Sequence, residues 1–158
     1  MDGLPTSADL DVRPATDADA FAISFLLEDL GHPIEPARIV EKLAEIRDSP
    51  VDRVWVVESH ANAVPGDGQA LAGLLSLHAI TLLHTAGRLA RITALVVHPK
   101  LRGKGIGRRL VDVAEHFARG INCERVEVTS GEQRHDAHRF YTTLGFSPHS
   151  ARFVKRLD

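Results

Sequence analysis

Hydrophobic positions change their spacing along the chain, and these changes mark the expected elements. Runs of apolar residues that are continuous or alternating predict strands over 11–15, 53–59, 70–80, 88–97, 124–129 and 150–157. Apolar residues at three- and four-residue spacing predict helices between Thr16 and Gly31, between Pro36 and Pro50, from about 105 to 119, and over 135–144. The order β-α-α-β-β-β-α-β-α-β predicts an α/β fold with a mixed, mostly antiparallel central sheet and helices on both faces.

Capping residues give the first helix clear bounds. Thr16 has the chemistry of an N-cap, and Asp19 three residues later completes a variant of the capping box. Gly31 suits the left-handed residue that ends a helix. We expect this helix to bury six apolar side chains: Phe21, Ile23, Phe25, Leu26, Leu27 and Leu30.

One stretch in the second half of the chain combines a strand, a glycine-rich turn and a helix. The strand ends before Pro99, which cannot donate to a sheet ladder. Glycines at 103, 105 and 107 allow a tight turn, and basic side chains surround them. The first amides of the helix that follows have no partner within the helix, and its dipole makes that end positive. The pattern favours a phosphate or diphosphate site, and its alternative is a glycine-rich turn with a solvated basic face.

The spacing of the glycines selects among phosphate-binding motifs. No Walker sequence is present, and for a dinucleotide fingerprint the third glycine comes one residue early. The spacing instead fits [RQ]-x-x-G-x-[GA], filled by Arg102, Gly105 and Gly107. The run LVVHPKLRGKGIGRRLV, which starts at residue 95, resembles motif A of the Gcn5-related N-acetyltransferases, and AHRFYTTLGF, over 137–146, resembles their motif B. The resemblance is specific over residues 88–158.

The resemblance implies acetyl-CoA as the co-substrate and assigns the groups that hold it. The backbone of Leu95, Val96 and Val97 would line the pantetheine arm, and an amide of Leu95 or Val97 would face the thioester oxygen. The diphosphate would lie on a loop of seven residues: Arg102, Gly103, Lys104, Gly105, Ile106, Gly107 and Arg108. Tyr141 stands where motif B carries its general acid, and its alternative is a tyrosine packed with its hydroxyl satisfied.

Two positions depart from the family pattern. Arg134 stands where motif B often has an asparagine that contacts the cofactor. Its guanidinium cannot make the same contact, but its charge suits a phosphate of the cofactor. Thr93 stands where a strand carboxylate often acts as the base, and it cannot accept a proton at neutral pH. The candidate bases are His78 and Glu127, and the alternative is deprotonation of the amine through ordered water.

Composition limits the remaining possibilities. The 158 residues suit a single domain over 10–158 that follows a loose tail over 1–9. A net charge of −2 does not favour nucleic acid or a membrane surface as a partner. Cys123 is the single cysteine and no signal peptide is evident, so we expect a cytoplasmic protein. The nine histidines form no recognised ligand spacing, so we expect no metal.

These features lead to an N-acetyltransferase hypothesis. The reaction would move an acetyl group from acetyl-CoA to a primary amine of a small molecule or peptide, by direct attack in a ternary complex. The absent carboxylate at Thr93 keeps open a non-catalytic CoA-binding module, acting as a sensor or subunit. A nucleotide-binding dehydrogenase fits poorly, because the earlier strands read as an antiparallel meander. Family habit makes a homodimer plausible.

Overall fold

The computed structural model describes residues 11–58, 71–130, 134–149 and 152–157. They belong to two compact units, residues 1–128 and 129–158, and each unit is described by itself. The expected tail over 1–9 and the expected turn over 62–69 lie outside the described residues.

The first unit is built on a five-stranded sheet in the order β1-β2-β3-β4-β5. The strands are β1 (Asp11–Pro14), β2 (Asp52–Glu58), β3 (Leu71–Thr81), β4 (Arg88–Val97) and β5 (Cys123–Val128). Neighbouring strands are antiparallel except for the parallel pair β4–β5. The predicted mixed, mostly antiparallel sheet is confirmed, and β1 lies at its edge, as expected of a strand that contains proline.

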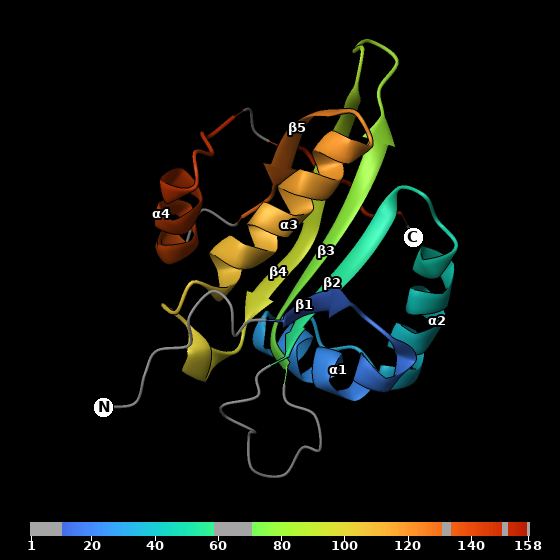
Figure 1. Ribbon diagram of the computed structural model, residues 1–158, viewed down its shortest axis with the longest axis vertical. Coiled ribbons are helices and arrows are strands. Elements are labelled where there is room, and N and C mark those ends of the chain that lie inside the picture. The colour runs from blue at the N-terminus through green and yellow to red at the C-terminus, as the bar shows by residue number, and fades with distance from the viewer. Residues whose placement is uncertain (1–10, 59–70, 131–133, 150–151, 158) are drawn as a thin grey trace. The chain divides into compact units, whose positions relative to one another are not determined.

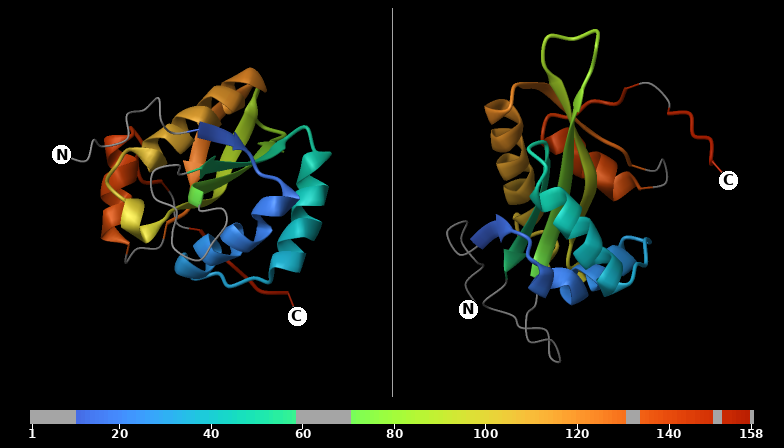
Figure 2. Two further views of the ribbon diagram at one scale, coloured as in Figure 1. Left: turned by 60° about the horizontal axis from the view of Figure 1, so that its bottom comes forward. Right: turned by 90° about the vertical axis from the view of Figure 1, so that its right-hand side faces the viewer.

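Helices cover both faces of this sheet (Figures 1 and 2). The helices α1 (Ala20–Asp29) and α2 (Pro36–Arg47) pack on one face, where a core forms with Val56, Leu74 and Val96. Helix α3 (Ile106–Gly120) packs on the other face, over Gly73. A Cβ at Gly73 would lie 3.0 Å from side-chain carbons of both Ile106 and Leu110, so this glycine lets α3 approach the sheet closely.

Helix α1 presents two of its phenylalanines to solvent, contrary to the expectation that both are buried. Phe21 is 63% exposed and Phe25 is 54% exposed, whereas Ala20, Ile23 and Leu26 are buried. The helix is apolar nearly all round, so its sequence does not reveal which side faces the sheet. The small side chain of Ala20 and the three-residue spacing to Ile23 and Leu26 define the packed side.

A buried carboxylate fixes the start of the chain's first helical segment. Asp19 closes the predicted capping box with Thr16 and is fully buried. Both of its oxygens accept hydrogen bonds of 2.8 Å from the guanidinium of Arg13, whose Nε also donates to Glu58 at 2.6 Å. The pair therefore connects β1, the following turn and β2.

The second unit contains α4 (His135–Thr143) and an extended end. Gly145, with a φ of 92°, is the predicted left-handed residue after this helix. The predicted last strand over 150–157 is wrong in its described part, because residues 152–157 form no strand. Phe153 and Val154 are adjacent and would point to opposite faces of a strand, so the segment has no consistent apolar side; both are exposed.

None of the helices in the described part of the chain has the length and apolar composition needed to cross a membrane.

Asp19 should contribute strongly to stability in a pH-dependent way. Burial raises the pKa of Asp19, but hydrogen bonds from Arg13 and Thr16 outweigh it and hold the pKa below its ordinary value. Because the pKa of Asp19 is lower in the folded state than in the unfolded state, its ionised form stabilises the fold. This stabilisation is present above the carboxyl pKa of the unfolded chain, about 4, and is lost as pH falls through the pKa of the folded state. We expect Asp19→Asn to lower the free energy of unfolding by about 3 kcal/mol at neutral pH, measured by urea denaturation, and by less in acid.

Asp17→Asn is the matched control. Asp17 forms an exposed ion pair with Arg47 at 2.6 Å, and such pairs contribute at most about 1 kcal/mol. Equal losses in the two variants, at every pH, would contradict this account of Asp19.

Candidate active site

Strands β4 and β5 separate halfway along β4. Their parallel pairing runs from Arg88 opposite Cys123 to Ile92 opposite Val128, where β5 ends. Strand β4 continues to Val97, and in this last part it pairs only with β3. The backbone of residues 93–97 therefore has a side with no strand partner in the described part of the chain. Such a side suits an extended ligand that uses main-chain hydrogen bonds.

A bulge in β4 lies where the two strands separate. Ser76 of β3 pairs with Ala94 and Leu77 pairs with Ile92, so Thr93 has no opposite residue. The Thr93 hydroxyl donates to the carbonyl of Ser76 at 3.2 Å. A bulge bends its strand and re-aims the residues beyond it. Sequence reasoning took Thr93 only as a missing base, and no signal in the sequence pointed to the bulge.

The loop after β4 leads into an uncapped helix end. The buried side chain of His98 accepts a hydrogen bond from the Lys100 amide at 3.2 Å, which fixes the first turn of the loop. Gly105 has a φ of 82° and immediately precedes α3, and it provides no side chain to cap the helix. The amides of the first turn of α3 are therefore available to an anion. A Cβ at Gly105 would have open space around it, so the positive φ alone favours glycine.

Arg102 connects this loop to α1. Its guanidinium donates to Asp29 at the end of α1, with an N–O distance of 2.7 Å, and its Nε donates to the Val97 carbonyl at 3.3 Å. Sequence reasoning placed Arg102 on the diphosphate. In the structure its side chain bridges the end of β4 and the end of α1. To bind a phosphate, the guanidinium of Arg102 would have to leave Asp29 and pair with the phosphate instead.

The two candidate bases lie in one row across the sheet. Asp52 of β2 pairs with His78 of β3, His78 with Arg91 of β4, and Arg91 with Glu127 of β5. His78 Nδ1 lies 2.5 Å from Asp52 Oδ1, and Arg91 lies 3.2 Å from Glu127. The row is next to the last paired residues of β4 and β5, so it adjoins the point of separation.

The surroundings of Glu127 make it a poor base. Arg125 donates to Glu127 at 2.9 Å, and Arg91 contacts its other oxygen. The hydrogen bond from Arg125, with a further one from Arg91, outweighs burial and lowers the pKa of Glu127 below its ordinary value. A carboxylate held between two guanidinium groups has little tendency to take a proton.

Tyr141 and Arg134 belong to the second unit. Arg134 immediately precedes α4, and Tyr141 lies on the helix between Phe140 and Phe146, with ring-centre distances of 5.2 and 5.6 Å. Burial raises the pKa of Tyr141, although the nearby charge of Arg134 opposes the shift. The phenol therefore keeps its proton at neutral pH, as a general acid must.

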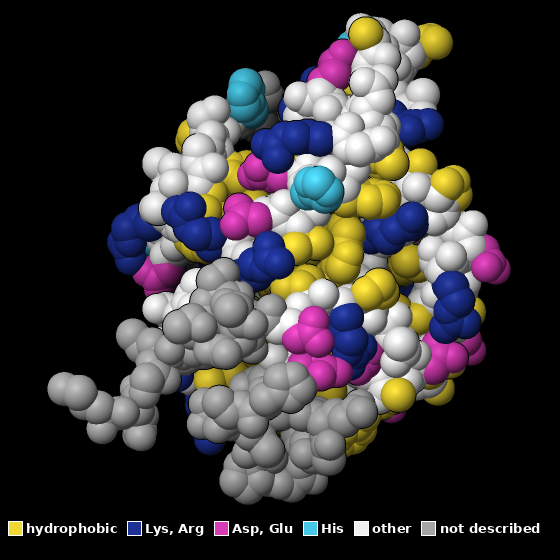
Figure 3. Space-filling model, viewed as in Figure 1, with side chains coloured by type: hydrophobic (Ala, Val, Ile, Leu, Met, Phe, Trp, Pro, Cys, Tyr) yellow, Lys and Arg dark blue, Asp and Glu magenta, His cyan; other side chains and the backbone are white. Residues whose placement is uncertain are grey.

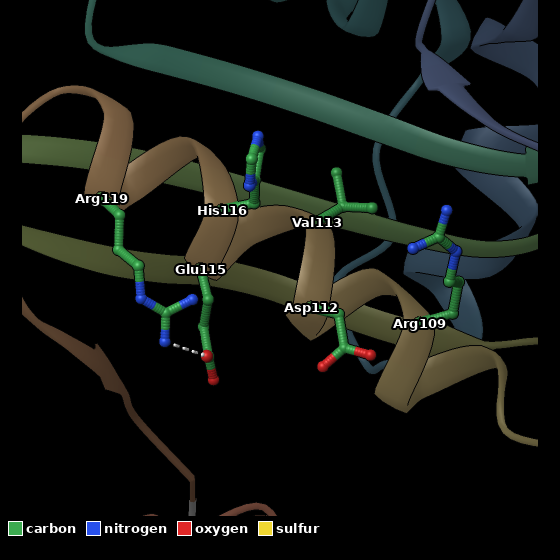
Figure 4. Close-up of a pocket in the computed structure, with 6 residues that line it drawn as sticks. All are labelled: Arg109, Asp112, Val113, Glu115, His116 and Arg119. Carbon is green, nitrogen blue, oxygen red and sulfur yellow. Dashed lines mark hydrogen bonds and ion pairs between the residues drawn. The ribbon is translucent and has the colours of Figure 1, made fainter.

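Other parts of the described structure offer less chemistry. A shallow hollow runs along the outer side of α3, where Figure 4 shows side chains diverging on both sides of the helix. The single interaction drawn there joins Glu115 and Arg119, at 2.9 Å. Figure 3 shows side chains of both charges on this side of α3, beside a strip of hydrophobic ones. Among the described residues, no three His, Cys, Asp or Glu side chains gather as metal ligands.

Comparisons with known proteins identify the family of this chain. The sequence profile of the acetyltransferase (GNAT) family matches residues 23–146. Residues of this chain are 40% identical over 87 positions to an aminoalkylphosphonate N-acetyltransferase of Salmonella typhimurium, which covers 55% of this chain and 56% of that enzyme. The chain spans about half the length of the curated relatives it matches, or less.

Solved structures share the fold over nearly the whole chain. A transcriptional regulator from Bacillus halodurans superposes with a TM-score of 0.78 at 25% identity, covering 94% of this chain and 99% of that one. An aminoglycoside N-acetyltransferase in complex with CoA superposes with a TM-score of 0.76 at 13% identity, covering 94% of each chain. The chain belongs to the GNAT family of acetyltransferases, and the family uses acetyl-CoA.

The left-handed turn at Gly105 should be needed for CoA binding. We expect Gly105→Val to weaken CoA binding about tenfold or more, because a β-branched residue resists a positive φ and would re-aim the amides of the turn. Isothermal titration calorimetry with CoA measures the change.

Gly120→Val is the matched control for this prediction. Gly120 ends the same helix, has no positive φ, and has open space where a Cβ would lie. It should change CoA affinity by no more than about twofold. Unchanged affinity in Gly105→Val, with the fold retained, would remove the turn from the binding site.

Proposed function

We propose that this protein transfers the acetyl group of acetyl-CoA to a primary amine of a small molecule or peptide, by direct attack in a ternary complex. The observation that carries the proposal is the separation of β4 from β5 immediately before the glycine-rich loop. It combines an open strand edge, which suits the amide groups of a pantetheine arm, with an uncapped helix end, which suits a diphosphate.

The backbone does most of the holding in this proposal. The main-chain groups of Leu95, Val96 and Val97 bind the pantetheine arm. The amides of the loop bind the diphosphate, supported by nearby cations; the loop residues are Arg102, Gly103, Lys104, Gly105, Ile106, Gly107 and Arg108. Arg134 of the second unit adds a further cation for a phosphate. Backbone amides at a helix end cost no reorganisation when the anion arrives, because the fold already aims them.

Two groups of the chain act on the thioester. The amide of Leu95 or Val97 donates to the carbonyl oxygen and stabilises the oxyanion that forms when the amine attacks. Tyr141 donates its phenolic proton to the sulfur as the carbon–sulfur bond breaks. Its raised pKa supports this role, because the acid must be protonated before the reaction.

The acceptor is proposed as a small primary amine. The similarity to an enzyme named for aminoalkylphosphonates supports testing amines that also carry a phosphonate group first. Similarity to a mycothiol acetyltransferase of Tsukamurella paurometabola, 27% identical over 114 residues, adds the substrate class for which that enzyme is named to the set.

Release of free CoA in the presence of a panel of amines tests the proposal. The panel contains aminoalkylphosphonates, amino sugars, polyamines and short peptides, and the thiol is measured as it forms. The expected result is amine-dependent release by at least one class. Tight CoA binding with no release from any class would favour instead the non-catalytic CoA-binding module, for which the exposed Thr93 in place of a carboxylate is the supporting feature.

Tyr141→Phe should lower kcat about 10²-fold and leave CoA affinity unchanged, because the phenol acts only when the thiolate leaves. Steady-state kinetics and calorimetry measure the two quantities.

Thr142→Val provides the control, since it removes the next hydroxyl on α4, which donates to the His138 carbonyl at 2.8 Å. It should change kcat by no more than about twofold. Full turnover in Tyr141→Phe would exclude the tyrosine as the acid.

A further inference from the structure

We infer that His78 is the base that deprotonates the acceptor amine, and that Asp52 positions it. The inference rests on the proposed function and adds the group that accepts the proton. Its basis is the close contact between the His78 ring and the Asp52 carboxylate, with 2.5 Å between Nδ1 and Oδ1. A carboxylate on Nδ1 fixes the imidazole ring and leaves Nε2 as the nitrogen that takes a proton.

Asp52 is itself held in place. The Ser49 hydroxyl donates to its other oxygen, Oδ2, at 2.6 Å, and the amide of Val51 donates to the Ser49 oxygen at 3.2 Å. The three side chains form a chain of hydrogen bonds from the segment after α2, through the start of β2, to β3. Ser49 thus orients the carboxylate of Asp52, and the carboxylate orients the ring of His78. This arrangement is expected of a catalytic base, because each hydrogen bond restricts the rotation of the side chain that it holds.

The dyad lies on an accessible face of the sheet. Asp52 and His78 are each four residues from a member of the core under α1 and α2, Val56 and Leu74, and strand side chains at even spacing share a face. The side chain of Asp52 is 26% exposed and that of His78 is 45% exposed, so the helices leave this end of the face open. An amine from solvent can therefore reach the ring.

The dyad also lies near the proposed acyl site. His78 is three residues along β3 from Leu75, the residue paired with Leu95, which corresponds to about 10 Å along the strand. The Thr93 bulge lies between these positions on β4, and Thr93 is exposed. Ordered water between the ring and the amine at the thioester carries the proton across this separation in the proposed reaction.

The charged groups around His78 favour it over Glu127. Asp52 on β2 faces the ring directly, and Arg91 on β4 is its neighbour on the other side. Arg91 is engaged by Glu127, which Arg125 also contacts. The two arginines thus neutralise Glu127, whereas the partner of His78 is a carboxylate that orients its ring.

The proton balance is closed without another reactant. The ammonium of the acceptor loses one proton to His78 Nε2, and the freed nitrogen lone pair forms a bond to the thioester carbon. The carbon–sulfur bond breaks, the sulfur takes the proton of Tyr141, and the nitrogen's second proton returns to the phenolate through solvent. His78 releases its proton to bulk water, so each turnover yields an amide, a thiol and one proton.

His78→Asn tests the inference, because the amide of asparagine can still donate to Asp52 but has no nitrogen that takes up a proton as Nε2 of histidine does. We expect kcat at pH 7 to fall about 10²-fold with an alkylamine, with CoA affinity unchanged by calorimetry. Raising the pH towards the pKa of the alkylammonium, about 10, should restore much of the rate, because solution then supplies the neutral amine. Asp52→Asn, the second variant, should show a smaller loss with the same recovery at high pH.

His84→Asn is the control, since His84 is an exposed histidine of the connection between β3 and β4 and should leave the rate unchanged. Full activity of His78→Asn at pH 7, or equal losses at every pH, overturns the inference. A loss confined to Glu127→Gln does so as well. Absence of amine-dependent CoA release by the unmodified protein would instead remove the proposed function, and this inference with it.

Discussion

The short length of β5 is the constraint on which the candidate site depends. It ends at Val128, opposite Ile92, while β4 continues to Val97 with β3 as its only strand partner in the described structure. An unpaired strand edge inside a sheet is costly unless something uses its hydrogen-bonding groups. The bulge at Thr93 bends β4 at the same point. Both features favour an extended ligand beside β4 rather than a sixth strand.

Close packing of α3 sets the position of the proposed anion site. The helix can approach β3 because Gly73 has no side chain in the way of Ile106 and Leu110. Its first turn is thereby held near the end of β4, and Gly105, in the left-handed conformation, leaves that turn without a side-chain cap. Arg102 then connects this turn to α1, on the opposite side of the sheet from α3, through Asp29. One side chain thus connects the glycine-rich loop with the end of α1.

Local signals in the sequence predicted most of the fold. Strand β4 has the predicted bounds. Helix α2 begins at Pro36, and Gly31 and Gly145 take positive φ values just after α1 and α4, as predicted. Proline and glycine are reliable signals because they constrain the backbone within a few residues. The side of α1 that faces the core was not predictable from a helix apolar all round. The prediction of the last strand was wrong for a similar reason: a strand requires a partner, and the local pattern of 150–157 does not specify one.

The proposed cofactor loop could be recognised from sequence, which also named His78 and Glu127 as candidate bases but could not choose between them. Glycines and arginines that bind a phosphate are contiguous in the chain, so their spacing is legible. His78 is 26 residues from Asp52, and Arg91 is 36 residues from Glu127; only the register of three strand pairs brings them into one row. The ion pairs that lower the basicity of Glu127 and the carboxylate that orients His78 depend on that register.

The backbone amides of the glycine-rich loop are the centre of this account, and NMR can observe them one by one. Titrating CoA into ¹⁵N-labelled protein should shift the amide signals of Leu95, Val97 and residues 103–108 most, at a stoichiometry of one. Signal shifts confined to the outer side of α3, around Asp112 and His116, or no shifts at all, would contradict binding of CoA by these amides.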